Sequence, residues 1–255
     1  MELFDLHTHT RYSDGKNTVV DNIRMAEASG LAFLAITDHM KDIKETGWIE
    51  AMLYDIKSTD TGVRVLTGVE GTILDTQGTV SVSREIAGKL DVVLADMSSH
   101  TRGVLNNRFT DLETLKGAIL RAYTNICKND VVDIVAHPFN LGRHPVTRGI
   151  VYLDSFSEKD LKKVAGAFAE NDKIFEIMNQ MAWWFPDVPM DKFTRDYVKL
   201  VKIFAGEGVM FSMGSDAHSA GAVANLTWAR KVIEAAGIES RLINPGVFLN
   251  RKRKI

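Results

Sequence analysis

The stretch that decides the fold is Phe4-Asp5-Leu6-His7-Thr8-His9, a short apolar run that ends in two histidines. Residues i and i+2 of a strand point to the same side, so both imidazoles can reach one metal ion. A histidine just past an apolar run recurs along the chain. Six of the seven histidines have this position: His7, His9, His39, His100, His137 and His218. Imidazoles converging from several strand ends predict a polynuclear metal site in a barrel enzyme.

Apolar runs of strand length alternate with segments of helical period along the chain. The predicted strands are residues 3–6, 31–37, 63–69, 91–95, 131–136, 173–177 and 209–213, and the predicted helices are residues 18–29, 112–127, 158–170, 191–206 and 222–236. No Pro/Gly-rich linker interrupts the series, so we expect an α/β fold with one barrel domain over residues 1–255. A doubly wound sheet is the alternative. The barrel is favoured because only a closed sheet brings the ends of distant strands together.

The composition is that of an ordinary globular protein, with 45% hydrophobic and 25% charged residues in 255. A net charge of -2 gives no electrostatic reason to expect nucleic acid or an anionic membrane as a partner. The single cysteine, Cys127, is expected to be a small buried side chain rather than half of an internal disulfide. No apolar run approaches the roughly 20 residues of a membrane helix, and the N-terminus lacks a signal-like pattern. We therefore expect a cytoplasmic protein.

Carboxylates accompany the histidines. Glu70 ends an apolar strand, where a lone buried carboxylate is costly unless it is paired with a charge or bound to metal. Asp216 and His218 follow the last predicted strand and repeat the i, i+2 spacing. A glutamate at the depth of Glu70 can bridge two ions, so these residues indicate more than one metal ion.

Taken together, these motifs resemble the PHP (polymerase and histidinol phosphatase) family. The residues that carry the resemblance are Asp5-Leu6-His7-Thr8-His9-Thr10 with Ser13-Asp14-Gly15, Ile36-Thr37-Asp38-His39, Gly68-Val69-Glu70, Ser99-His100, Ala136-His137-Pro138 and Gly214-Ser215-Asp216-Ala217-His218. The pattern is most similar to the small standalone phosphatases without a polymerase. The resemblance implies a distorted (β/α)7 barrel, similar to a TIM barrel, that hydrolyses phosphate esters. It also implies two or three divalent ions, usually zinc, manganese or iron, at the C-terminal ends of the strands.

The resemblance further implies which side chains bind these ions. The first ion would be held by His7, His9, Glu70 and Asp216, the second by Glu70, His100 and His137, and the third by Asp14, His39 and His218. Some branches of the family have a histidine at the position of Asp14. An aspartate is a harder ligand than imidazole, so it would favour manganese or iron at the third position.

Such a site can perform hydrolysis without a covalent intermediate. Two or three ions that share a carboxylate lower the pKa of a bridging water from about 16 toward about 7, so a metal-bridged hydroxide is the expected nucleophile. Three ligands are also candidate catalytic residues: His218, His39 and Asp216. Either histidine could protonate the leaving alkoxide, although an imidazole bound to metal cannot do so at the same time.

Candidate substrate contacts lie on loops that follow predicted strands, because these loops line the active face of a barrel. Arg102, Arg143 and Arg148 are the candidate phosphate ligands, and Asn179 is a candidate for substrate or water. Trp183-Trp184-Phe185 could stack on a ring of the substrate, but a packed lid or a subunit contact is the favoured interpretation. His144, outside the motifs, has a smaller claim to a catalytic role.

Three functions remain open. The leading one is hydrolysis of a small phosphate monoester, with histidinol phosphate, a nucleotide and a sugar phosphate as possible substrates. The alternative is a phosphodiesterase or exonuclease acting on nucleotides or short oligonucleotides. A non-catalytic metal-binding module is the third, and the complete ligand set argues against it. The sequence does not indicate an oligomeric state.

Overall fold

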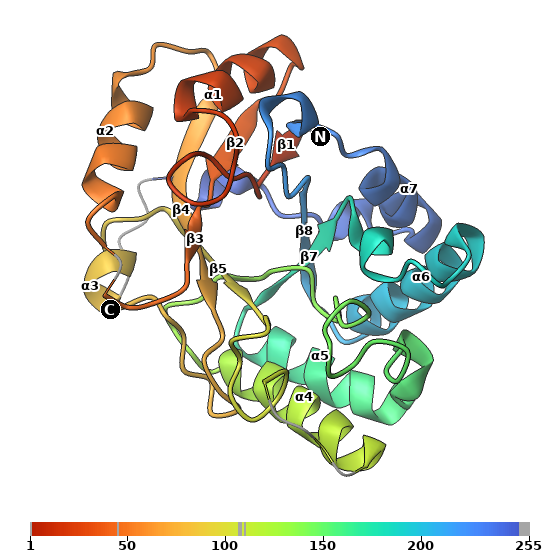
Figure 1. Cartoon of the computed structure of the whole chain (residues 1–255). Helices are drawn as coiled ribbons and strands as arrows, with labels where there is room; N and C mark the ends of the chain where they lie inside the picture. Colours follow the sequence, from red (N-terminus) through yellow and green to blue (C-terminus); the bar gives the residue numbers. More distant parts are fainter. Residues whose placement is uncertain (1, 45, 107–108, 110, 250–255) are drawn as a thin grey trace.

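In the computed structural model, residues 2–44, 46–106, 109 and 111–249 are described, and they form one sheet with flanking helices (Figure 1). The sheet contains β1 (Phe4–Asp5), β2 (Phe33–Ile36), β3 (His39–Met40), β4 (Arg64–Thr72), β5 (Val92–Asp96), β6 (Ile134–Val135), β7 (Ile174–Met178) and β8 (Met210–Gly214). Its strand order is β1-β2-β4-β5-β6-β7-β8, and β3 adds to β4. Every pair is parallel. The carboxyl ends of all strands therefore point the same way.

The helices lie outside the ring of strands (Figure 1). They are α1 (Val19–Ala28), α2 (Ile49–Ser58), α3 (Arg84–Ala87), α4 (Leu112–Ile126), α5 (Glu158–Glu170), α6 (Met190–Gly206) and α7 (Thr227–Ala236). Short 3-10 turns are η1 (Leu153–Ser155), η2 (Met181–Trp184), η3 (Ala220–Ala222), η4 (Glu239–Arg241) and η5 (Pro245–Val247). A helix outside each crossover is what a parallel barrel requires.

Strands β1 and β8 approach each other and nearly close the barrel. The Leu6 backbone N–H donates to the Met213 carbonyl at 3.2 Å, and the Asp216 N–H donates to the His7 carbonyl at 2.9 Å. These bonds join the segments that follow the first and last strands of the sheet. The predicted fold, a distorted (β/α)7 barrel, is confirmed.

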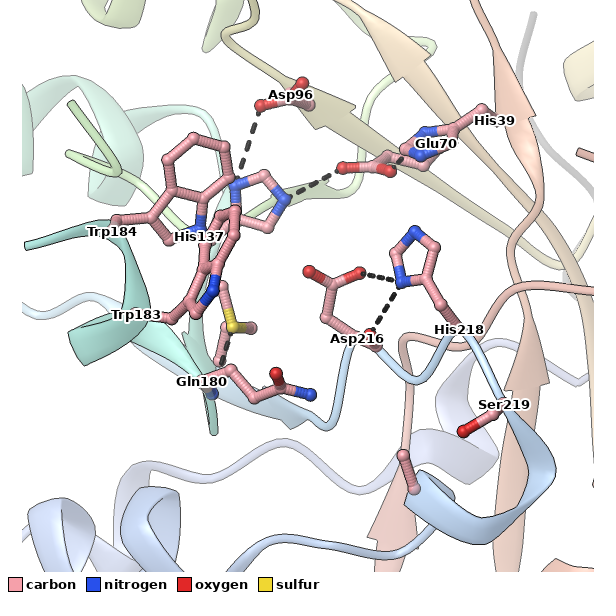
Figure 2. A pocket seen from close by; sticks show the side chains of 12 residues that line it. His39, Glu70, Asp96, His137, Gln180, Trp183, Trp184, Asp216, His218 and Ser219 are labelled. Carbon is pink, nitrogen blue, oxygen red and sulfur yellow. Dashed lines mark hydrogen bonds and ion pairs between the residues drawn. The ribbon is translucent and has the colours of Figure 1, made fainter. Parts of the chain in front are cut away.

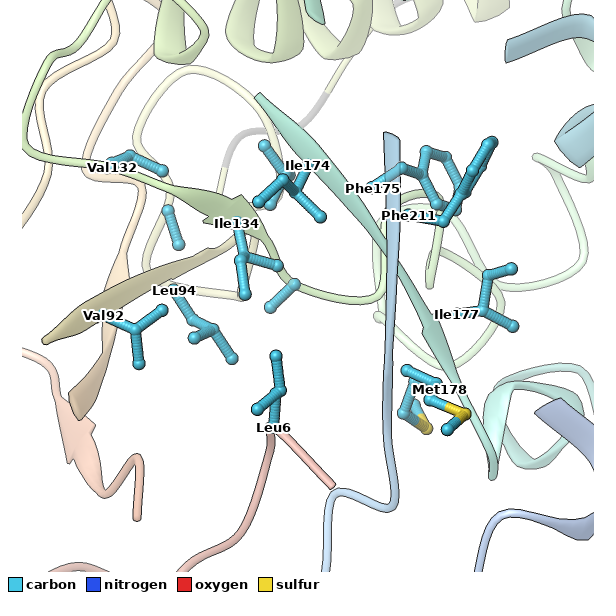
Figure 3. Close-up of a cluster of buried hydrophobic side chains, with 14 of the residues drawn as sticks. Leu6, Val92, Leu94, Val132, Ile134, Ile174, Phe175, Ile177, Met178 and Phe211 are labelled. Carbon is cyan, nitrogen blue, oxygen red and sulfur yellow. The ribbon is translucent and has the colours of Figure 1, made fainter. Parts of the chain in front are cut away.

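The strands read as continuous apolar runs because both of their faces are covered. In β5, residues 92–95 are all buried. Leu6, Leu94, Ile134 and Phe175 belong to one cluster of buried side chains drawn from separate strands (Figure 3). Such a cluster fixes the relative positions of the strand ends, where the polar side chains begin.

The helices supply the outer half of the core through one apolar stripe each. In α6 the buried side chains are Phe193, Tyr197, Leu200, Val201 and Phe204, a helical spacing. The Phe204 ring meets the Phe175 ring of β7 with 4.8 Å between centroids, which attaches α6 to the sheet.

The sequence predicted most of the helices and strands but missed β3, α2 and α3. Predicted helix 158–170 matches α5, whose start is fixed by Ser157, because its hydroxyl accepts the Asp160 N–H. The predicted helix 222–236 begins only at Thr227, since η3 precedes it as a separate turn. Helix α2 was missed because Trp48 at its N-cap offers no capping side chain. Of the described helices, none is long and apolar enough to cross a membrane.

Candidate metal centre

The polar side chains that follow the strands meet at one end of the barrel. His7 and His9 follow β1, Glu70 lies in β4, and Asp216 and His218 follow β8. Because the strands are parallel and the sheet is nearly closed, these carboxyl ends converge. Four groups of side chains could each hold a metal ion, because the donor atoms within a group all lie within 4.8 Å of one another. The groups are His9, Asp14, His39 and His218; His7, His137 and Glu176; His7, His9 and Asp216; and Glu70, Asp96 and His137.

Glu70 occupies the middle of the cluster. Its Oε2 lies 2.7 Å from Nδ1 of His39 and 3.4 Å from Nε2 of His7. Its Oε1 lies 3.0 Å from Nε2 of His137. The side chain is almost fully buried, so its charge has no bulk water to stabilise it. A carboxylate between three imidazoles can serve two ions at once.

A second part of the cluster is formed by the loop after β1. Asp14 lies 3.2 Å from Nε2 of His218 and 3.5 Å from Nε2 of His39. The loop is held by Asp38, which accepts the Thr10 N–H at 2.7 Å. Its carboxylate also accepts the Ser13 hydroxyl. Asp38 therefore positions the loop, although the sequence gave it no such role.

The donor atoms of the cluster fit metal ions because several of them lack another partner. Among the described residues, the buried atoms without a hydrogen bond include His7 Nε2, His9 Nδ1 and Asp96 Oδ1, while Glu70 Oε2 contacts imidazoles of the cluster itself. Leaving a buried polar atom unsatisfied costs about 1–3 kcal/mol. Several such atoms in one protein cluster are costly unless a cation joins them, and imidazole and carboxylate are suitable ligands for zinc, manganese or iron.

Glu176 of β7 orients two of the imidazoles. Its Oε1 lies 2.8 Å from Nδ1 of His7, which leaves Nε2 of His7 directed to the cluster. Its Oε2 accepts the His137 backbone N–H at 2.8 Å. Gly214 makes this approach possible, because an added Cβ would overlap Glu176 Oε1 and lie 2.5 Å from His7 Cβ. A carboxylate behind a ligating histidine fixes its tautomer and raises its basicity.

Two residues of the cluster have a left-handed backbone. The φ angle is 29° at His137 and 55° at Asp216. Such angles cost about 1–3 kcal/mol each for residues other than glycine and are found mostly at functional sites. Here hydrogen bonds from the neighbouring strands hold them, since the His137 N–H donates to Glu176 and the Asp216 N–H to the His7 carbonyl.

The charged groups in the cluster strongly shift one another's pKa values. Burial alone would raise the pKa of Glu70, but the imidazoles of His7 and His39 hold it well below its usual value. Burial lowers the pKa of His39, but the carboxylate of Glu70 outweighs it and the pKa reaches about 10. Burial raises the pKa of Asp96 to about 6, although His137 opposes the shift. Protons and a divalent cation compete for the same lone pairs in such a site.

The structure brings eight of the nine expected ligands together and leaves His100 outside. Strand β5 ends at Asp96, and His100 lies further along in an exposed turn, 3.5 Å from the Ser98 hydroxyl. Asp96 points to the cluster in its place, with Oδ1 3.5 Å from Nδ1 of His137. The sequence signal was available, because Asp96 directly follows an apolar run just as Glu70 does.

The structure also leaves the three expected phosphate-binding arginines away from the cluster. The Arg102 side chain is 70% exposed and lies 3.9 Å from Asp75. Arg143 lies over the Trp183 ring, 3.8 Å from its centroid. Arg148 is exposed. Within the described part of the chain, no lysine or arginine lines the recess above the cluster.

Asn179 was expected to contact substrate, but it lies at the start of α7. Its Oδ1 accepts the backbone N–H groups of Trp228 at 2.8 Å and Ala229 at 3.2 Å, in the first turn of α7. It therefore acts as the cap of that helix, whose own N-cap position, Leu226, offers no side-chain acceptor. The neighbouring Gln180, not Asn179, lines the recess.

A recess of about 600 Å³ opens above the cluster (Figure 2). Besides cluster residues, it is lined by Met178, Gln180, Trp183, Trp184, Ser219 and Ala222. The sequence favoured a lid or a subunit contact for the tryptophan segment, whereas the structure places both indoles on the wall of this recess. His144 is buried behind Trp184, with 5.1 Å between the ring centroids. Burial lowers the pKa of His144 to about 4, so its imidazole is neutral near pH 7.

Comparison with known proteins agrees with the motifs. Residues 5–180 match the family described as the PHP domain. The chain belongs to the PHP family. A probable phosphatase of Thermoanaerobacter sp. (strain X514) is 31% identical over 264 residues, which cover 99% of this PHP protein and 97% of the relative. A probable phosphatase of Caldanaerobacter subterraneus subsp. tengcongensis is 29% identical over 265 residues, covering 99% of this chain and 92% of the relative.

Solved structures show the same fold. The histidinol phosphate phosphatase of Lactococcus lactis, in complex with zinc, L-histidinol and phosphate, has a TM-score of 0.63 and 18% identity over 92% of this PHP chain and 94% of its own. A Listeria monocytogenes protein that carries the name putative histidinol phosphatase has a TM-score of 0.61 and 12% identity over 86% of this chain and 97% of its own. The predicted family is confirmed.

Proposed function

We propose that this PHP protein is a metal-dependent phosphatase that hydrolyses a small phosphate monoester. The observation that carries the proposal is a cluster of imidazoles and carboxylates around Glu70 at the floor of an open recess, in which buried donor atoms of His7, His9 and Asp96 have no hydrogen bond. Relatives named probable phosphatases and a structural neighbour that binds zinc, L-histidinol and phosphate support the same reaction class.

The cluster would hold two or three divalent ions of zinc, manganese or iron. Its groups divide into His7, His9, Glu70 and Asp216 for the first ion, Glu70, His137 and Asp96 for the second, and Asp14, His39 and His218 for the third. Asp96 here replaces the expected His100. The second group then has two carboxylates and one imidazole, a harder set of donors that favours manganese or iron over zinc. Bound ions would supply positive charge to the phosphate and acidify water at neutral pH.

The protein's own side chains have distinct parts in this reaction. Asp216 and His39 lie among the ligand groups, and their contacts with other ligands orient them there. His218 is more exposed than His39, with 40% of its side chain accessible against 21%. Its Nδ1 lies 3.0 Å from the Asp216 carbonyl oxygen, and its Nε2 lies 3.2 Å from Asp14. The more exposed His218 is the candidate for protonating the leaving alcohol when only two ions are bound, because an imidazole that holds the third ion cannot donate a proton at the same time.

Among the described residues, no lysine or arginine lines the recess, and this limits how the protein can bind the phosphate group. Without such cations, the charge of the phosphate must be balanced by the ions and the imidazoles. The expected arginine clamp is therefore not part of the proposal.

The proposal is tested with p-nitrophenyl phosphate and the diester bis(p-nitrophenyl) phosphate. The protein is assayed as purified, after chelation, and after the return of zinc, manganese or iron(II). Monoester turnover that disappears on chelation and returns with metal is the expected result. Faster turnover of the diester would favour a phosphodiesterase, and no turnover of either ester at full metal content would contradict the proposal.

A further inference from the structure

The segment that follows β8 carries several residues of the candidate site. This β8 loop, residues 215–224, holds Asp216 and His218 of the cluster and Ser219 and Ala222 of the recess wall. Asp216, His218 and Ser219 follow one another along it beside the recess (Figure 2). Loops are more mobile than the strands they connect. The β8 loop therefore needs fixed points if its ligands are to keep their positions relative to the ligands that follow β1.

One buried carboxylate holds both ends of the β8 loop. Asp5, the last residue of β1, is fully buried. Its Oδ1 accepts the Ser215 N–H at 2.8 Å, and its Oδ2 accepts the Ala224 N–H at 3.0 Å. Ser215 and Ala224 are the first and last residues of the loop. The two oxygens of one side chain therefore close the loop against the first strand of the barrel.

The same carboxylate also reaches the ligands that follow β1. Its Oδ1 accepts the His7 backbone N–H at 3.4 Å. One oxygen atom thus joins the backbone of His7 to that of Ser215, which precedes Asp216 in the sequence. His7 and Asp216 belong to the same group of possible metal ligands. The position of Asp5 therefore sets the spacing between the two halves of this group.

The backbone at Ala224 is strained, and Asp5 restrains it. The φ angle of Ala224 is 66°, in the left-handed region that residues other than glycine seldom adopt. Such a conformation persists only where neighbouring groups hold it. Within the same loop, the Ala220 N–H donates to Oδ1 of Asn17 at 3.0 Å. Two side-chain acceptors, those of Asp5 and Asn17, therefore attach the second half of the β8 loop to the segment around β1.

Asp5 belongs to the motif Asp5-Leu6-His7-Thr8-His9, yet it is not one of the possible metal ligands. Burying a carboxylate is costly unless hydrogen bonds replace those it made with water. An asparagine of the same shape could accept at only one end of the loop, because its amide nitrogen is a donor and would face a backbone N–H. Holding both ends therefore requires a carboxylate at this position.

We propose that Asp5 is a positioning residue that fixes both ends of the β8 loop and thereby holds Asp216 and His218 in place for metal binding. The inference rests on the proposed metal-dependent function, because the loop carries proposed metal ligands. It adds a residue that contacts neither the ions nor the substrate. Asp5 acts through backbone groups alone and takes no part in the making or breaking of bonds.

The test measures the metal affinity of the Asp5→Asn variant. Zinc or manganese is titrated into the chelated protein in competition with a chromophoric chelator. The variant should bind metal about 10- to 100-fold more weakly than wild type, because loss of a group that orients metal ligands has an effect of that size. Turnover of p-nitrophenyl phosphate by the variant should fall at low metal concentration and recover at saturating metal, since every ligand is still present.

Asp133→Asn is the matched control. Asp133 is buried, and its carboxylate accepts the Val93 N–H at 2.8 Å. It directly precedes β6 and so lies at the end of the strands opposite to the cluster. This variant should lose stability but keep the metal affinity of wild type. Equal weakening of metal binding in the two variants would overturn the inference, because the effect would then be one of general stability.

Hydrogen exchange in the unaltered protein gives a readout that needs neither a variant nor turnover. The Ser215 and Ala224 amides should exchange slowly even after chelation, because Asp5 and not an ion holds them. They should exchange faster in Asp5→Asn. Rapid exchange of both amides in the chelated wild type would overturn the inference, as would wild-type metal affinity in Asp5→Asn.

Failure of the inference can be distinguished from failure of the proposed function. If the wild-type protein hydrolyses no monoester while Asp5→Asn still weakens metal binding, the phosphatase function is contradicted and the role of Asp5 is supported. If the wild-type protein is a metal-dependent phosphatase and Asp5→Asn matches it at every metal concentration, the role of Asp5 is contradicted and the function stands.

Discussion

Replacement of Asn179 by alanine should destabilise the protein without weakening substrate binding. The Asn179 Oδ1 accepts two N–H groups of the first turn of α7, at 2.8 Å from Trp228 N and 3.2 Å from Ala229 N. Those N–H groups have no partner within the helix, because the first four donors of any helix lack one. In alanine the acceptor is gone and nothing in the new side chain replaces it.

The expected cost follows from the two lost hydrogen bonds. Loss of a helix cap costs about 0.5–2 kcal/mol, and with two partly buried donors we expect about 1–2 kcal/mol for Asn179→Ala. In a chain of this length that corresponds to a fall in Tm of about 2–8 °C. Asn179→Asp keeps an acceptor and places a negative charge at the helix N-terminus, which is favourable by about 0.3–1 kcal/mol. The aspartate variant should therefore be as stable as wild type.

The assay combines urea denaturation of the metal-loaded proteins with steady-state kinetics well below the Tm. For Asn179→Ala, KM should stay within about twofold of wild type, because a lost substrate contact would appear in KM or kcat/KM. A tenfold rise in KM with an unchanged free energy of unfolding would refute this reasoning. Asn179 would then be the substrate ligand that the sequence suggested.

Three further perturbations test other parts of the structure. Asp96→Asn should lower the metal content measured by elemental analysis by about one ion per chain, whereas His100→Ala should leave it unchanged; the opposite pattern would restore His100 as the ligand. Gly214→Ala should lower the free energy of unfolding, measured by urea denaturation, by about 1–3 kcal/mol, because the added methyl displaces Glu176 from His7. A variant as stable as wild type would show that Glu176 and His7 can move apart without cost. His144 takes up a proton only near pH 4 in the folded protein but near pH 6.5 when unfolded. The unfolded state therefore binds more protons between these values, and the free energy of unfolding decreases as the pH is lowered from 6.5 to 4. Measured across that range, the stability advantage of wild type over His144→Gln should shrink by up to about 3 kcal/mol, and a constant difference would contradict the burial of this imidazole.

The sequence was most informative where side chains follow strands of regular length. His7, His9, Glu70 and Asp216 could be placed together because parallel strands end on one face of a barrel and each of these residues lies within a few positions of the end of an apolar run. That rule uses only local pattern and topology. It is sensitive to the point at which a strand ends, since β5 ends at Asp96 and the expected ligand His100 lies four residues further along.

Substrate contacts could not be predicted in the same way, since loops have no regular period. Arg102, Arg143 and Arg148 were chosen because they follow strands, but the direction of a loop side chain depends on tertiary packing. Arg143 was drawn to the face of Trp183. Asn179 was taken for a substrate contact because nothing local shows that α7, some fifty positions away, lacks its own cap.

The bonds between β1 and β8 have a consequence for how the protein is made. His9 and Asp216, whose side chains meet at 3.0 Å, are separated by 207 positions in the chain. A ribosome releases His7 and His9 long before β8 is synthesised. These two histidines therefore lack the Asp216 side chain until β8 and the residues after it have left the ribosome. Contacts this distant in sequence form late in folding, because the entropy of closing the intervening loop must be overcome first. The cluster therefore forms only after β8 has been synthesised, and metal binding would report the closure of the barrel.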